Sequence, residues 1–147
     1  MNPEKNYDHL FSPLGGPEEL KTLGVITFLR SPQVPMEKDA LLRSGARYAF
    51  MGIPFDEGNV GKPGSEEGAQ AFRIASHEYF PYWFEYQVDL EGKCVDCGNV
   101  RIPKVSPLLA HERIYKAVRE VLASGVVPII CGGDHSISIA ASRALSD

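Results

Sequence analysis

One apolar run constrains the fold of this chain more than any other feature of its sequence. Residues 126–131 read Val-Val-Pro-Ile-Ile-Cys, and a pair of glycines ends the run. A short run in which apolar residues do not alternate with polar ones is typical of a parallel strand that is covered on both faces. We therefore expect Ile129, Ile130 and Cys131 to be buried on a central strand of a parallel sheet.

Strand and helix patterns alternate along the chain from Ala46 onward, which predicts an α/β fold with a mostly parallel sheet. Ser65 and Ser106 are the expected N-caps of two of the helices, and Pro107 suits the first turn of the second. In chain order, the expected elements are a strand at 48–53, a helix at 66–77, short strands at 86–89 and 93–96, a helix at 106–124, a strand at 126–131 and a helix from residue 136 onward.

The first 45 residues differ in texture from the rest of the chain. Five prolines and a Gly-Gly pair allow only short regular elements there. We expect a brief helix at 17–23 and a short strand or buried anchor at 24–29. The chain is therefore divided into a proline-rich arm, residues 1–45, and an α/β portion, residues 46–147.

The composition excludes several classes of function. Acidic residues outnumber basic ones by 19 to 15, for a formal net charge of −4, and the basic residues are scattered along the chain. Nucleic-acid binding through a basic face is therefore not expected. No apolar run approaches the ~20 residues of a membrane-spanning helix, so no membrane is expected as a partner. The N-terminus resembles no export signal, which predicts a cytoplasmic protein whose three cysteines stay reduced.

Two motifs invite functional interpretations that their spacing does not support. Cys94 and Cys97 form a lone C-x-x-C, which is half of a zinc site, and in a strand their side chains would point to opposite faces. We expect free, at least partly buried thiols. The glycine-rich loop 56–65 is not a phosphate-binding P-loop, because only two residues separate its first glycines and Pro63 removes a backbone donor.

Aromatic residues and two histidines have mainly structural interpretations. The aromatic stretch 79–86 could form a wall of a substrate site, but packing of a loop onto the core, or into a subunit contact, is favoured. His77 and His111 are expected to face solvent or to cap helix ends.

The turn that follows the apolar run is the strongest candidate for a functional site. Gly132 and Gly133 permit a sharp turn at the carboxyl end of a predicted strand, where open α/β sheets bind ligands. The imidazole of His135 is a good ligand for a divalent transition metal, and Asp134 or Ser136 could orient it. Alternatively, His135 is a hydrogen-bonded loop residue and Asp134 or Ser136 caps the next helix. The residues alone leave both interpretations open.

Several segments, in this order and spacing, resemble motifs of the ureohydrolase superfamily, the relatives of arginase and agmatinase. The matching segments are 52–58 with 62–64 and 71–73, which resemble G-x-P-x-D-x-G, R-P-G and A-I-R; 96–100, which resembles D-x-G-D-V; and 132–136, which reads Gly-Gly-Asp-His-Ser.

The resemblance implies a three-layer α/β/α fold with a mostly parallel sheet, incomplete at its C-terminal side. It implies that His135 is a ligand of a dinuclear metal centre, usually manganese and in some members nickel, with Asp134 supporting it from outside the ligand set. The remaining family ligands lie in D-x-H-x-D and D-x-D segments, which this sequence does not contain. This 147-residue chain alone is therefore expected to be inactive.

The resemblance also implies an activity: hydrolysis of a guanidino C–N bond with release of urea, by an enzyme that forms homotrimers or homohexamers when complete. Lys62 in place of the usual arginine and Asn99 in place of the second aspartate favour a branch that hydrolyses guanidine or guanidino acids. Two rivals stay open. One is a non-catalytic, truncated chain that binds a full-length paralogue, and the other is a small redox or zinc protein that uses Cys94 and Cys97.

Overall fold

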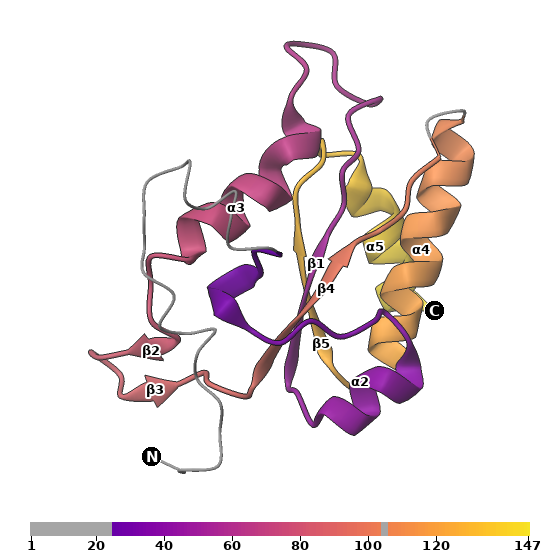
Figure 1. Ribbon diagram of the computed structural model, residues 1–147. Coiled ribbons are helices and arrows are strands. Elements are labelled where there is room, and N and C mark those ends of the chain that lie inside the picture. Colours follow the sequence, from indigo (N-terminus) through magenta and orange to yellow (C-terminus); the bar gives the residue numbers. More distant parts are fainter. Residues whose placement is uncertain (1–24, 104–105) are drawn as a thin grey trace.

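The computed structural model describes residues 25–103 and 106–147. Its centre is a three-stranded parallel sheet in the order β4-β1-β5 (Figure 1). The strands are β1 (Tyr48–Gly52), β4 (Cys94–Asn99) and β5 (Val127–Cys131). All three end at the same edge of the sheet, so the loops that follow them are brought together there.

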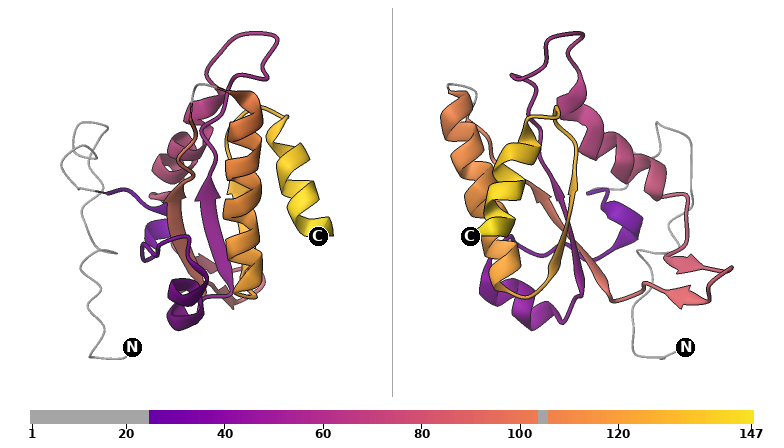
Figure 2. Two further views of the ribbon diagram at one scale, coloured as in Figure 1. Left: turned by 90° about the vertical axis from the view of Figure 1, so that its right-hand side faces the viewer. Right: turned by 180° about the vertical axis from the view of Figure 1, so that it is seen from behind.

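Helices cover both faces of this sheet. One face carries α4 (Pro107–Ala123) and α5 (Ile137–Ser146), and the other carries α3 (Gly68–Ser76) and the 3-10 turn η2 (Phe28–Arg30) (Figure 2). A short helix, α2 (Lys38–Ser44), packs beside α4 near the start of β1. The three-layer α/β/α arrangement with a parallel sheet is thus confirmed.

Successive side chains of β1 point to opposite faces of the sheet, and each face forms an apolar layer of its own. On the α4 and α5 side, Ala49 and Met51 of β1 join one hydrophobic core with the buried positions of both helices. On the opposite side, the ring of Phe50 stacks on Phe28 at 4.5 Å and lies 6.0 Å from the ring of Phe72. The second layer fixes the segment before α2 onto the sheet, because Phe28 belongs to that segment.

The position predicted for the apolar run is wrong in one respect. Residues 127–131 do form a parallel strand, but β5 lies at an edge of the described sheet and β1 is the central strand. Ile129, Ile130 and Cys131 are accordingly half-buried. An uninterrupted apolar run predicts that both faces of a strand are covered by other elements. It does not specify whether the strand has a neighbour on one side or on both sides in the sheet.

The arm is more regular than its prolines suggest where the structure describes it. The strand predicted at 24–29 is wrong, because Leu29 and Arg30 adopt positive φ values of 50° and 56° in the 3-10 turn. The alternative of a buried anchor holds in part for Phe28, which is half-buried and stacks on Phe50, and α2 was not expected. The helix predicted at 17–23 lies outside the described residues, and the domain boundary at residue 46 stays a prediction.

Helix boundaries follow the capping signals in one case and not in the other. Ser106 caps α4, since its Oγ accepts a hydrogen bond from the amide of Leu109 at 3.4 Å. Ser65 caps nothing: it lies inside a 3-10 turn, η3 (Ser65–Glu67), that leads into α3.

The aromatic stretch forms a small hairpin of its own, and it does not pack onto the core. Strands β2 (Tyr82–Trp83) and β3 (Val88–Asp89) pair antiparallel, whereas the next predicted strand joins the parallel sheet as β4. Trp83 and Phe84 are 58% and 76% exposed. The favoured interpretation as core packing is therefore wrong, and a subunit contact stays a prediction.

Candidate functional site

The loops that follow β1 and β5 are joined by backbone hydrogen bonds at the carboxyl edge of the sheet. The amide of Asp134 donates to the carbonyl of Phe55 at 2.8 Å, and the amide of Gly133 donates to the carbonyl of Ser65 at 3.0 Å. The first of these bonds holds the β5 loop against the β1 loop, and the second holds it against η3, the turn that leads into α3. The predicted candidate residues thus lie in one turn that is hydrogen-bonded to both of these segments.

The two glycines of this turn are required by its geometry. Gly132 and Gly133 have φ values of 87° and 75°, which other residues adopt only with strain. A Cβ atom on Gly133 would lie 2.6 Å from the carbonyl oxygen of Ile53, and one on Gly132 would lie 2.8 Å from the amide nitrogen of Ala69. The glycine pair therefore allows the close approach of three segments of backbone.

Asp134 is the buried centre of the turn. Its Oδ1 accepts hydrogen bonds from the amide of Ser136 at 2.9 Å and from the hydroxyl of Ser136 at 2.5 Å, and its Oδ2 accepts one from the amide of Gly58 at 2.8 Å. Burial alone would raise the pKa of Asp134, but the hydrogen bonds from Ser136 and Gly58 outweigh it and hold the pKa below its ordinary value. The carboxylate thus fastens the start of α5 to the β1 loop.

His135 lies directly after this clamp and is exposed. Within the described part of the chain, its ring has no hydrogen-bond partner. The carboxylate of Asp134 bonds Ser136 and Gly58 instead of the imidazole, so it ties the residue after His135 to the β1 loop, while the amide of Asp134 holds the residue before it. That His135 is a metal ligand and that Asp134 supports it stay predictions.

The expectation that the other two histidines face solvent or cap helix ends is wrong for His111. It holds in part for His77, which occupies the C-cap of α3 but is buried. His111, in the second turn of α4, is half-buried: its ring makes a T-shaped contact with that of Phe55, with the ring centroids 5.4 Å apart, and its Nε2 lies 3.5 Å from Ser136 Oγ. Helical spacing contained a signal for this placement, because His111 precedes the buried Ile114 by one turn.

His77 is 7% exposed, and neither ring nitrogen has a hydrogen-bond partner among the described residues. Burial, and secondarily the charge of Arg30, lowers its pKa.

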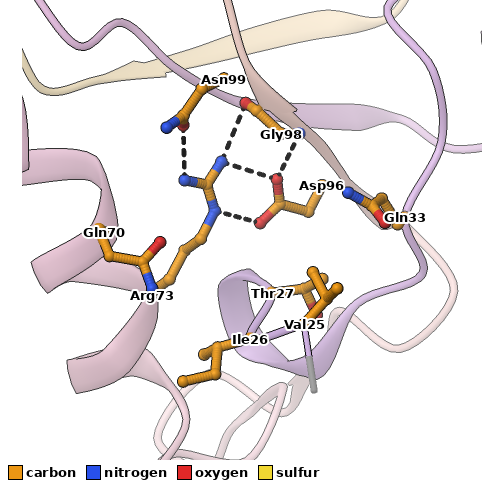
Figure 3. Close-up of a pocket in the computed structure, with 9 residues that line it drawn as sticks. All are labelled: Val25, Ile26, Thr27, Gln33, Gln70, Arg73, Asp96, Gly98 and Asn99. Atoms are coloured by element: carbon orange, nitrogen blue, oxygen red, sulfur yellow. Dashed lines mark hydrogen bonds and ion pairs between the residues drawn. The ribbon is translucent and has the colours of Figure 1, made fainter. Parts of the chain in front are cut away.

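Sequence reasoning missed a buried ion pair beside the site. The guanidinium of Arg73, on α3, donates through Nε and Nη2 to both carboxylate oxygens of Asp96, at 2.7 and 2.9 Å (Figure 3). Nη1 donates to Asn99 Oδ1 at 2.7 Å. In the sequence, Arg73 stands out only as the last residue of the segment 71–73. Its partner Asp96 lies 23 residues further along the chain, so no local pattern links the two. The pair braces α3 against the middle of β4, and the bond to Asn99 reaches the end of the strand.

A pocket of about 180 Å³ lies next to this ion pair. The residues that line it come from the segment before α2, from α3 and from the end of β4, and they are Val25, Ile26, Thr27, Gln33, Gln70, Arg73, Asp96, Gly98 and Asn99 (Figure 3). The charges of its two buried ionic residues cancel. The other polar groups of the pocket are amides and one hydroxyl, and Val25 and Ile26 add an apolar part.

The thiols are free, as predicted. Cys97 belongs to the core beside α4, whereas Cys94 interacts with Ser31 on the opposite side of the sheet. Burial raises the pKa of Cys94 to about 11 and that of Cys97 to about 12. Since a thiolate is the form that binds metal or exchanges disulfides, these residues do not support a zinc or redox function.

The described residues do not make a complete metal centre. In 25–103 and 106–147, no three side chains of His, Cys, Asp or Glu lie close enough together to hold an ion. The exposed imidazole of His135 suits a single ligand position. Nor does any helix in these two ranges have the length and apolarity to cross a membrane.

Fold, motif order and the geometry of the glycine turn together define a ureohydrolase-type α/β domain. The family model of the arginase family matches residues 46–147, and the chain belongs to this family.

Individual relatives agree with this assignment. The chain is 33% identical over 141 residues to the guanidinobutyrase of Pseudomonas aeruginosa, a match that covers 93% of this chain and 43% of the relative. The structure of proclavaminate amidino hydrolase from Streptomyces clavuligerus superposes with a TM-score of 0.73 at 26% identity, over 83% of this chain and 39% of that protein. A Trypanosoma cruzi formiminoglutamase variant with Mn²⁺ gives a TM-score of 0.62 at 30% identity, with coverage of 76% and 40%.

The chain spans well under half the length of the curated relatives it matches, 32%, 43% and 36% for three of them. The expectation of an incomplete arginase-like fold is thus confirmed.

Proposed function

We propose that this chain supplies the N-terminal part of a metal-dependent hydrolase that cleaves a guanidino C–N bond and releases urea. The observation that carries the proposal is the glycine turn, in which Asp134 fixes the backbone on both sides of an exposed His135 at the carboxyl edge of the sheet. A relative named guanidinobutyrase favours a guanidino acid as the substrate class.

His135 would be one ligand of a pair of divalent ions. Manganese is the first candidate, because a family member carries it, and nickel is the second. When bound, such ions polarise the substrate and supply hydroxide near neutral pH. The role of this chain is to hold the imidazole of His135 toward solvent, with Asp134 preventing the turn from shifting.

The complete site needs carboxylates from the remainder of the protein. We therefore expect the 147-residue chain to bind manganese weakly and to release no urea. The proposal further includes a cytoplasmic location and a homotrimer or homohexamer when the protein is complete. No contact among the described residues favours the alternative of a non-catalytic partner of a paralogue.

The test compares three proteins: this chain, a chimera in which the C-terminal remainder of guanidinobutyrase follows it, and the chimera with His135→Ala. Urea release from guanidinobutyrate, agmatine, arginine and guanidine is measured together with bound metal after dialysis. We expect activity and metal only in the unsubstituted chimera. If the His135→Ala chimera keeps its full metal content and activity, His135 is not a metal ligand. If the 147-residue chain alone releases urea, the claim that its site is incomplete is refuted.

A further inference from the structure

His111 occupies a place at the site that neither the motif pattern nor the proposed function explains. It lies on α4, outside every matching segment, yet its ring makes a T-shaped contact with Phe55 in the β1 loop, with an interplanar angle of 85°. Its Nε2 lies 3.5 Å from the hydroxyl of Ser136, next to the candidate ligand. One side chain thus contacts both loops that form the site.

The directions of the hydrogen bonds around Ser136 follow from its single hydroxyl proton. Ser136 Oγ lies 2.5 Å from Asp134 Oδ1, and a carboxylate can only accept, so the proton of the hydroxyl is used there. The oxygen then has lone pairs left for His111, whose Nε2–H must be the donor. The result is a chain that runs from His111 through Ser136 to Asp134.

The chain continues into the β1 loop. Asp134 Oδ2 accepts from the amide of Gly58 at 2.8 Å, and a Cβ on Gly58 would approach Ser136 Oγ to 2.7 Å. Only a residue without a side chain brings its amide this close. The polar chain and the contact with Phe55 therefore connect α4, the start of α5 and the β1 loop around His135.

We propose that His111 is a positioning residue, which acts through Ser136 and Asp134 to hold the His135 turn and the β1 loop in one arrangement. Its consequence for metal binding rests on the proposed function, but the positioning itself does not. Because the 3.5 Å separation is long for a hydrogen bond, we expect a modest effect of about three-fold.

The test is amide hydrogen exchange of the 147-residue chain without metal. His111→Phe keeps an aromatic ring against Phe55 and removes the donor, whereas His111→Gln keeps an N–H near the position of Nε2. We expect His111→Phe to speed exchange at Gly58 and Ser136 about three-fold and His111→Gln to restore most of the protection. The amide of Val118, in the buried middle of α4, is the control for global stability.

A double-mutant cycle decides whether the effect passes through Ser136. In a Ser136→Ala background, His111→Phe should change the exchange of Gly58 by less than half as much. Unchanged exchange at Gly58 in the single His111→Phe variant, equal acceleration at Val118, or a full effect in the Ser136→Ala background would each overturn the proposal. In the chimera, His111→Phe should weaken manganese binding a few-fold. If the chimera proves inactive, the exchange result still stands, so the two failures are distinguishable.

Discussion

Arg73 and Asp96 form a bidentate ion pair whose side chains are only 4% and 1% exposed. The pair joins α3 to β4, and Asp96 also accepts from the amides of Phe28 and Gly98, at 2.7 and 2.8 Å. One carboxylate therefore connects the helix, the strand and the segment before α2.

Removal of one member of this pair should strongly destabilise the fold, because it leaves the other charge buried without a partner. We expect Arg73→Leu to lower the free energy of unfolding by about 3–5 kcal/mol. Urea denaturation followed by circular dichroism measures the loss. Arg143→Leu is the matched control, since Arg143 and Glu112 pair at 2.6 Å but are 53% and 38% exposed. Its loss should stay below about 1 kcal/mol, and equal losses would contradict the argument.

Gly133→Ala should be far more costly than Gly45→Ala, although both glycines have positive φ values, 75° and 67°. The backbone strain, about 1–2 kcal/mol, is common to both. Of the two, Gly133 adds a collision, with the carbonyl of Ile53, whereas no atom of the residues that the structure describes lies within 4 Å of a Cβ on Gly45. Thermal unfolding of the two variants tests this, and a similar melting temperature for both would show that the turn can relax.

The hydrogen bonds to Asp134 make a pH-dependent contribution to stability. Because the folded-state pKa lies below the unfolded value, the contribution is complete above the unfolded pKa of about 3.9 and is lost as pH falls through the folded pKa. We expect Asp134→Asn to destabilise most near pH 7, and the gap to the unsubstituted protein to narrow below about pH 4. The midpoints of urea unfolding at several pH values measure this difference in stability. A difference that grows on acidification would contradict a lowered pKa of Asp134 in the folded protein.

Local chemistry was predictable from the sequence, and pairing across the fold was not. The glycine turn, the Ser106 cap and the parallel strands follow from backbone sterics and apolar patterns that a few residues specify. The edge position of β5 depends on strand order, which no local pattern contains. Likewise, the partner of Arg73 and the burial of His77 are set by α3 packing on the sheet, so neither residue differs locally from an exposed one.

The cysteines give a final prediction that also tests the redox alternative. With pKa values of about 11 and 12, Cys94 and Cys97 carry almost no thiolate at pH 8, and both are buried. We expect each to react with iodoacetamide more than about 100-fold slower than an ordinary cysteine. The half-buried Cys131 should react first and serves as the internal reference. Mass spectrometry of labelled peptides follows the three sites, and urea at unfolding concentrations should equalise their rates. Fast labelling of Cys97 in the folded protein would mean that the core beside α4 opens readily. It would also support the alternative in which Cys94 and Cys97 form a reactive C-x-x-C.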